Sequence, residues 1–183
     1  MKTLQLILLL FGSTLLLLNS QCKKSGNTPP LTELQKLPAI TQGGLNTFGC
    51  LINGKAFVPG GGGVLSNVFS VIYDPTFQGG YLAISAKYYF GATNRQSVDL
   101  GADTIHSVGT YNLQLRSRYG IYYVDTRTSC SFYTLYDPPL SGTLIITRFD
   151  TITRIVSGTF SFKVTTAACG TIDGTDGRFD VRY

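Results

Sequence analysis

The sequence predicts an all-β domain, either an antiparallel β-sandwich or a closed β-barrel of about ten strands. Apolar and polar residues alternate with a period of two along several segments after Thr47, which is typical of strands with one buried face. Asn-Gly, Asp-Pro and Gly-Gly pairs separate those segments and favour turns. Tyr and Phe contribute 11 residues each, and no segment after Thr47 has a convincing helical period. These patterns predict the fold class but leave the choice between sandwich and barrel open.

The N-terminus is expected to be a lipoprotein signal peptide, residues 1–21, followed by a lipidated Cys22. Lys2 precedes an apolar run from Leu4 to Leu18, and the polar residues Asn19-Ser20-Gln21 lead to the cysteine. A charged start, a short apolar core and small or polar residues before a cleavage site are the parts of a secretory signal. A cysteine at that junction resembles the lipobox of bacterial lipoproteins, in which the thiol receives a diacylglycerol.

Two other interpretations of this segment remain open. The run could be an uncleaved N-terminal anchor helix, although its 15 residues are short for a membrane span, which needs about 20. It could also be a secretory signal that is cut before an unmodified Cys22, because Gln21 stands where a lipobox usually has Ala or Gly. On the lipoprotein interpretation, Cys22 anchors the protein in the bacterial cell envelope, and the outer membrane is the expected location. Whether the domain faces the periplasm or the cell surface is left open.

Residues 22–46 are expected to form a flexible tether, and residues 47–183 a single all-β domain. The tether begins with the polar, breaker-rich run Lys23–Pro30, and Gly43-Gly44 ends it. The domain opens with two strands around Asn53-Gly54, the strongest short hairpin signal. In chain order the expected strands are Phe48–Ile52, Lys55–Val58, Val64–Tyr73, Tyr81–Tyr88, Val98–Leu100, Gly109–Arg116, Ile121–Thr126, Cys130–Tyr136, Leu144–Phe149, Val156–Val164 and Phe179–Tyr183.

Both ends of the domain resemble an uncharacterised lipoprotein family from Bacteroidota. The stretch Asn46–Pro59 is similar to that family's opening, which tends to read TFGC-x-VNGK-x-W/F-x-P. The segments Leu144–Asp150, Ile155–Phe162 and Asp176–Tyr183, which include SGTFSF and DGRFDVRY, are similar to its C-terminal motifs. The resemblance implies a lipid-anchored, all-β envelope protein. It implies no activity and no functional residues.

The charge distribution argues against nucleic-acid binding. The formal net charge is +5, but from Thr47 onward 11 basic residues stand against 9 acidic ones, which leaves +2. That balance is typical of an ordinary solvated surface rather than a nucleic-acid footprint. The expected partner is therefore the membrane, through the anchor at Cys22, and any protein or ligand partner is left open.

Arg116, Arg118, Tyr122 and Arg127 form the candidate ligand surface. Arginines interleaved with tyrosines could bind an acidic or sugar ligand, although aromatic-rich strands also pack cores and cross-strand ladders. No acid–base pair accompanies these residues, so a site here would bind rather than catalyse.

Metal and catalytic signals are weak. Asp173, Asp176 and Asp180 offer carboxylates in a Gly-rich stretch that could hold calcium, but the spacing is not that of an EF-hand and Arg178 would oppose a cation. A β-turn with outward Asp side chains is the simpler interpretation. His106 is the only histidine, which excludes a His-rich metal site. The sequence predicts no cofactor and no catalytic residues.

Cys130 and Cys169 are predicted to form a disulfide, with Cys50 free. An oxidising envelope allows one bond among the three cysteines that follow Cys22. Cys50 alternates in phase with Phe48 and Ile52, which indicates a small buried hydrophobic residue. The other two cysteines adjoin turn residues, where strand ends meet.

The expected function is a non-catalytic binding or structural module of the cell envelope. The first alternative is a calycin-like carrier of a small apolar ligand, which requires an apolar cavity. The second is an envelope-polymer hydrolase, which requires a carboxylate pair in a cleft. The only Glu lies in the tether, so such a pair would have to come from the 9 Asp residues.

Overall fold

The structure is a computed structural model that describes residues 29–63, 66–113, 119–133, 141–167 and 169–183. The chain divides into two compact units, residues 1–30 and 31–183. The predicted signal peptide and Cys22 lie outside the described residues. Within those residues, no helix has the length and apolar character needed to cross a membrane.

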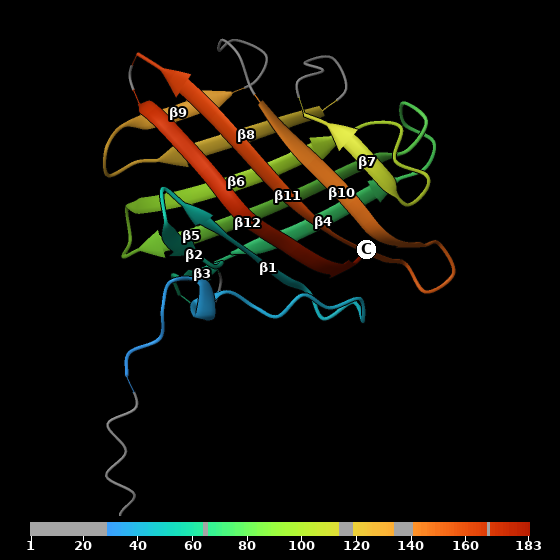
Figure 1. Cartoon of the computed structure of the whole chain (residues 1–183), viewed down its shortest axis with the longest axis horizontal. Coiled ribbons are helices and arrows are strands. Elements are labelled where there is room, and N and C mark those ends of the chain that lie inside the picture. The colour runs from blue at the N-terminus through green and yellow to red at the C-terminus, as the bar shows by residue number, and fades with distance from the viewer. Residues whose placement is uncertain (1–28, 64–65, 114–118, 134–140, 168) are drawn as a thin grey trace, which may run out of the picture. The chain divides into compact units, whose positions relative to one another are not determined.

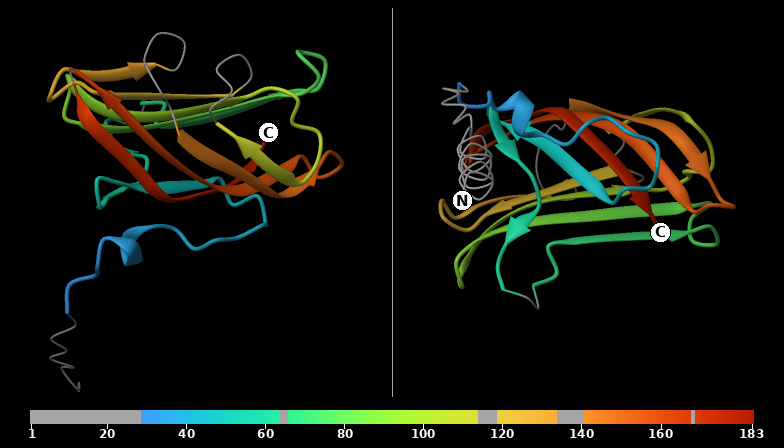
Figure 2. Two further views of the ribbon diagram at one scale, coloured as in Figure 1. Left: turned by 45° about the horizontal axis from the view of Figure 1, so that its top comes forward. Right: turned by 90° about the horizontal axis from the view of Figure 1, so that it is seen from below.

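Residues 31–183 contain two six-stranded sheets, which confirms the all-β prediction. Sheet A has the order β2-β1-β12-β11-β10-β7, and sheet B has the order β3-β5-β6-β8-β9 with β4 paired to β5. Figure 2 shows the sheets as two layers, and in Figure 1 the strands of one cross over those of the other. Pairings among the described strands join no strand of sheet A to sheet B, which fits the sandwich alternative and gives the closed barrel no support.

The two longest strands of this unit, β11 and β12, lie at its C-terminal end. Among the described residues, every strand pairing is antiparallel except that of β3 with β5. In chain order the elements are η1 (Leu34–Lys36), β1 (Thr47–Ile52), β2 (Lys55–Phe57), β3 (Gly60–Gly61), β4 (Phe69–Asp74), β5 (Tyr81–Phe90), β6 (Asn94–Ala102), β7 (Gly109–Asn112), β8 (Tyr119–Asp125), β9 (Cys130–Tyr133), β10 (Ser141–Asp150), β11 (Ile155–Thr166) and β12 (Gly170–Arg182).

The core lies between the two sheets and is filled by side chains from both. The Phe48 ring of sheet A lies 5.3 Å from Phe160 of its own sheet and 6.1 Å from Phe69 of sheet B, measured between ring centroids. Tyr73 of sheet B packs on Phe149 of sheet A, with 5.3 Å between centroids. Burial of such aromatic and aliphatic side chains is the main term that holds the layers together.

The stretch 173–180, interpreted from sequence as a turn, is part of strand β12. The prediction was wrong because the glycines serve packing rather than chain reversal. Gly174 and Gly177 pair with Phe162 and Phe160 of β11. A Cβ atom at Gly174 would lie 2.1 Å from the Phe162 ring, and one at Gly177 would lie 2.5 Å from the Phe160 carbonyl oxygen. The absence of side chains at these positions lets two core aromatic residues lie against the strand.

The packed unit begins at Leu31, so it includes residues 31–46, which the sequence assigns to the tether. We call residues 31–46 the lead-in segment. Glu33 accepts a hydrogen bond from the Ala56 amide at 2.8 Å, and Leu37 is buried. Further along, the Asp180 carboxylate accepts hydrogen bonds from the backbone amides of Gly43, Gly44 and Leu45 at 2.7 to 3.2 Å. These partners lie far apart in sequence, which is why local composition predicts a tether.

Asp180 is 1% exposed, yet it is held in its charged form. Burial is the largest single influence and raises its pKa. Together, the hydrogen bonds from Thr41, Ser157 and the lead-in amides outweigh the effect of burial and lower the pKa of Asp180 to about 2. Asp180 is therefore a structural anchor for the lead-in segment.

Candidate functional site

A cavity of about 510 Å³ lies at one end of the two sheets, and we call it the end cleft. It lies where the β1–β2, β8–β9 and β11–β12 connections meet, at the left-hand end of the domain in Figure 1. Its size is within the range of small-molecule sites. The lining residues are Ile52, Asn53, Lys55, Ala56, Phe90, Gln96, Tyr123, Asp125, Arg127, Thr128, Cys130, Cys169 and Ile172.

Arg127 is the most firmly positioned cation of the end cleft. Its Nε and Nη2 groups donate to the two carboxylate oxygens of Asp125 at 3.0 and 2.7 Å, and its guanidinium carbon lies 3.6 Å from the centroid of the Phe90 ring. The hydrogen bonds from Arg127 are the main reason that the pKa of Asp125 is lowered. A bidentate pair stacked on an aromatic ring fixes the guanidinium plane. The remaining N–H groups of Arg127 can then donate to a ligand.

Tyr123 and Gln96 form the polar floor of the cleft. Gln96 Nε2 donates to the Tyr123 hydroxyl at 2.9 Å, and Tyr123 is 3% exposed. Burial is the largest influence on Tyr123 and raises its pKa, so the phenol stays protonated. A neutral hydroxyl and a carboxamide at one place can donate and accept hydrogen bonds, as hydroxyl groups of a ligand require.

The β1–β2 turn supplies the opposite wall. Asn53 and Gly54 have φ angles of 49° and 75°, as the predicted Asn-Gly hairpin turn requires. Asn53 is fixed to β12 because its backbone amide donates to the Asp173 carbonyl at 2.8 Å and its side chain accepts from the Asp173 amide at 2.7 Å. Lys55 follows this turn and is exposed, and among the described residues its side chain has no hydrogen bond or ion pair; it interacts coulombically with Glu33, which is itself ion-paired with Lys36. Its ammonium group can therefore still bind an anionic ligand.

The back of the cleft is closed by the predicted disulfide. Cys130 and Cys169 are bonded, with 5.2 Å between their Cα atoms, and Cys50 is free and buried, so both parts of the cysteine prediction are confirmed. Cys130 belongs to β9 of sheet B, and Cys169 lies in the β11–β12 connection of sheet A. The bond therefore links the two sheets at the cleft.

The structure places only part of the predicted ligand surface at this site. Arg127 lines the cleft, whereas Tyr122 lies on β8 next to Tyr123 and so faces the other side of sheet B, with 36% exposure. Arg116 and Arg118 lie outside the described residues. Lys55, Gln96 and Phe90 also line the cleft and are not predicted from the sequence; they come from three different strands. Only the Asn-Gly turn, which orients the β1–β2 hairpin, gave any signal for Lys55.

The calcium candidates Asp173, Asp176 and Asp180 do not gather into one site. Asp180 is buried and binds the lead-in amides, while Asp173 lies 4.0 Å from the ammonium group of Lys163. Within the described residues, no group of three or more His, Cys, Asp or Glu side chains could hold a metal ion. His106 is exposed in the β6–β7 connection.

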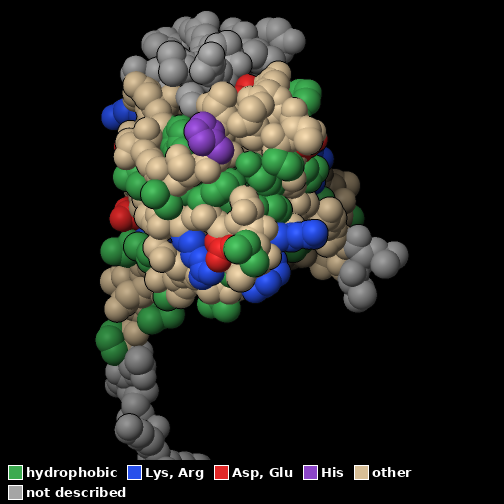
Figure 3. Space-filling model, turned by 90° about the vertical axis from the view of Figure 1, so that its right-hand side faces the viewer, with side chains coloured by type: hydrophobic (Ala, Val, Ile, Leu, Met, Phe, Trp, Pro, Cys, Tyr) green, Lys and Arg blue, Asp and Glu red, His purple; other side chains and the backbone are tan. Residues whose placement is uncertain are grey.

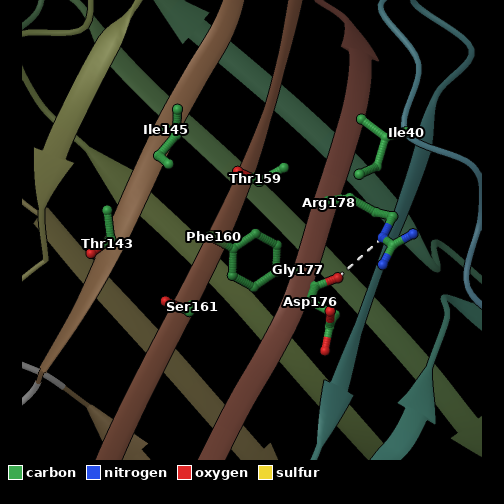
Figure 4. A pocket seen from close by; sticks show the side chains of 9 residues that line it. All are labelled: Ile40, Thr143, Ile145, Thr159, Phe160, Ser161, Asp176, Gly177 and Arg178. Carbon is green, nitrogen blue, oxygen red and sulfur yellow. Dashed lines mark hydrogen bonds between the residues drawn. The ribbon is translucent and has the colours of Figure 1, made fainter. Parts of the chain in front are cut away.

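A second hollow of about 300 Å³ lies on the outer face of sheet A (Figure 4). Hydroxyl groups of Thr143, Thr159 and Ser161 border it together with Arg178. The Arg178 side chain donates to the carbonyl oxygens of Asp176 at 3.1 Å and Pro38 at 3.4 Å, so it also braces the local backbone. The hollow offers fewer convergent charged groups than the end cleft, which makes the end cleft the better candidate.

Comparison of the chain with protein-family models, with curated proteins and with solved structures gave no match.

Proposed function

We propose that the protein is a non-catalytic, lipid-anchored binding module of the bacterial cell envelope, and that it holds a small anionic saccharide in the end cleft. The anchor rests on the apolar run that ends at Cys22. The binding role rests on one observation, the convergence of Lys55 and the fixed guanidinium of Arg127 on a cleft with a neutral polar floor.

The charge of the cleft favours an anion. Two basic side chains and one acidic side chain line it, and the acidic one, Asp125, is already paired with Arg127. Lys55 therefore contributes a second positive charge, which is partly offset by its coulombic interaction with Glu33. Tyr123 and Gln96 offer hydrogen bonds to hydroxyl groups, and Ile52 and Ile172 offer apolar surface for the flat side of a sugar ring.

The two alternative functions receive less support. An apolar carrier needs space between the sheets, and that space is filled by core side chains such as Phe48, Phe160 and Phe162. A hydrolase needs a general acid with a raised pKa. The carboxylate of the cleft, Asp125, has a lowered pKa because Arg127 binds it. A binding role agrees with both features.

Nuclear magnetic resonance titration with glucuronate and with glucose tests this proposal. We expect glucuronate to shift the resonances of cleft residues more strongly than glucose does, because only glucuronate carries a carboxylate. Lys55→Gln should weaken glucuronate binding about tenfold, the usual scale for loss of one charged hydrogen bond. Lys163→Gln serves as the matched control, because Lys163 lies on strand β11 away from the cleft.

The titration has a clear contrary outcome. If neither sugar shifts the cleft resonances, and native mass spectra of protein isolated from its own cells show no bound small molecule, the binding proposal is wrong. If glucose binds as well as glucuronate and Lys55→Gln has no effect, the ligand is not selected by charge.

A further inference from the structure

Four chain segments meet at the end of the sandwich opposite the cleft, which we call the loop end. They are the part of the lead-in segment before β1 and the β4–β5, β6–β7 and β10–β11 connections, all at the right-hand side of Figure 1. Contacts between the sheets hold this end together: the Tyr73 and Tyr183 ring centroids are 4.8 Å apart, and the Tyr73 hydroxyl donates to the Ile105 carbonyl at 2.8 Å.

Each of the four segments exposes one large hydrophobic side chain. A single exposed hydrophobic residue is common on protein surfaces and means little. Here, one exposed hydrophobic residue stands on each of four segments that meet at the same end of the domain, so these residues are not randomly scattered. The residues and their exposed fractions are Leu45 at 62%, Phe77 at 50%, Val108 at 58% and Ile152 at 93%.

Three arginines lie on or beside the turn that carries the most exposed of these residues, Ile152. Arg148, Arg154 and Arg182 lie at or beside the β10–β11 connection, and Asp150 is the acidic residue among them. Figure 3 views this end directly and shows basic side chains gathered beside acidic and hydrophobic ones. Asp150 is already paired with Arg148, with 2.8 Å between Nη2 and Oδ2. This cluster therefore keeps an excess of positive charge, which is confined to the β10–β11 side of the loop end because Asp74 and Asp103 stand at the starts of the β4–β5 and β6–β7 connections.

Hydrogen bonds brace the backbone of the β10–β11 connection at and after Ile152. Asp150 Oδ1 accepts hydrogen bonds from the amides of Ile152 at 3.0 Å and Thr153 at 2.9 Å. Arg182 Nη1 donates to the Thr153 carbonyl at 3.0 Å, which braces the turn from β12. A turn that is ordered before contact loses little conformational entropy when its tip binds.

We infer that the loop end docks non-covalently on a membrane surface that carries anionic phosphate headgroups. Ile152 and the other exposed side chains enter the boundary between headgroups and acyl chains, and the arginines contact the phosphates. A protein partner fits less well, because a stable protein interface needs a contiguous area of about 800 Å² on each side. The hydrophobic residues here stand on separate connections. This inference does not depend on the ligand of the end cleft.

Single-tryptophan variants of the full-length protein test the inference, because the natural chain contains no Trp. The protein is reconstituted into vesicles of phosphatidylglycerol or of phosphatidylcholine, and its fluorescence emission is compared with that of the same variant carrying Cys22→Ser in buffer without vesicles. Ile152→Trp reports on the loop end. Ile145→Trp is the matched control, since Ile145 is 39% exposed on the outer face of sheet A, away from the connection.

We expect Ile152→Trp to shift to shorter wavelength on phosphatidylglycerol vesicles and to be quenched by brominated acyl chains. The shift should be smaller on phosphatidylcholine vesicles than on phosphatidylglycerol vesicles. On phosphatidylglycerol, adding Arg154→Gln should also make the shift of Ile152→Trp smaller than it is without that substitution. Ile145→Trp should change little. An equal shift for both reporters, or no shift of Ile152→Trp on either vesicle, would overturn the inference. A shift that appears only when another envelope protein is added would assign the loop end to a protein partner instead.

Discussion

The Ser157 hydroxyl donates to the Asp180 carboxylate at 2.7 Å across strands β11 and β12, and neither side chain has more than 1% of its surface exposed. The same carboxylate accepts from Thr41 Oγ1 at 2.7 Å and from three backbone amides of the lead-in segment. One side chain therefore joins two strands of sheet A to the chain that precedes the sheet.

Replacing this carboxylate should loosen the lead-in segment and destabilise the domain. We expect Asp180→Asn to lower the free energy of unfolding by roughly 3 kcal/mol, because several charge-assisted hydrogen bonds are lost in a buried place. For a domain of this size that corresponds to a decrease of about 6–12 °C in Tm. Limited proteolysis should also cut more readily between residues 38 and 46. Asp176→Asn, at an exposed position of the same strand, should change neither result.

Stability should fall at acidic pH through the same residue. The folded pKa of Asp180 is about 2 and its ordinary value is 3.8, so its contribution is complete above about pH 4 and is lost as pH falls toward 2. The difference corresponds to about 2 kcal/mol. Urea unfolding at pH 6, 4 and 2.5 should show this decrease in the natural protein. A decrease of the same size in Asp180→Asn would show that other carboxylates are responsible.

Removing the disulfide should destabilise the domain strongly. The bond joins residues 39 positions apart, and closing a loop of that length stabilises by roughly 4 kcal/mol in the chain-entropy model. We expect the double variant Cys130→Ser/Cys169→Ser to unfold at a clearly lower urea concentration. Peptide mapping without reduction should find Cys130 linked to Cys169. Cys50 should react with alkylating reagents only after unfolding, because burial raises the pKa of its thiol and blocks access.

A methyl group at Gly174 should disturb the packing of β12 on β11. The Cβ atom of Gly174→Ala would lie 2.1 Å from the Phe162 ring, so the ring or the strand must move, at a cost of about 1–3 kcal/mol. Gly63→Ala is the control, since a Cβ atom there has no described heavy atom within 4 Å. Thermal unfolding of both variants measures the difference, and equal Tm values would contradict the packing role of Gly174.

Lipidation of Cys22 stays a prediction that labelling can decide. Growth of a bacterial host with a labelled fatty acid should mark the natural protein and leave Cys22→Ser unmarked. Equal labelling of the two proteins would end the lipoprotein interpretation and leave the uncleaved anchor or the unmodified secreted form.

The sequence predicted those features that depend on local pattern. Alternation predicted strands such as β5 and β11, the Asn53-Gly54 pair predicted the first hairpin, and turn neighbours indicated the correct cysteine pair. These signals succeed because side-chain direction and turn geometry are set within a few residues.

Features that depend on distant partners were missed. Nothing near Gly174 shows that Phe162 will lie against it, so the local sequence predicts a turn where the structure has a strand. Likewise, the lead-in segment looks like a tether until Asp180 is brought to it by the fold. The end cleft follows the same rule, since Lys55, Gln96 and Arg127 meet only when both sheets are assembled.

The pairing of β1 with β12 sets a condition on how the protein is made. Thr47 pairs with Asp180, and Ile52 pairs with Gly174. A growing or translocating chain that ends before β12 leaves β1 without this neighbour and leaves one edge of β11 open. Contacts between such distant segments slow folding and prolong the exposure of unpaired strand edges. The early hairpin β1–β2 therefore completes its sheet only after β12 has been synthesised, and a chaperone that covers the unpaired strand edges is needed until then.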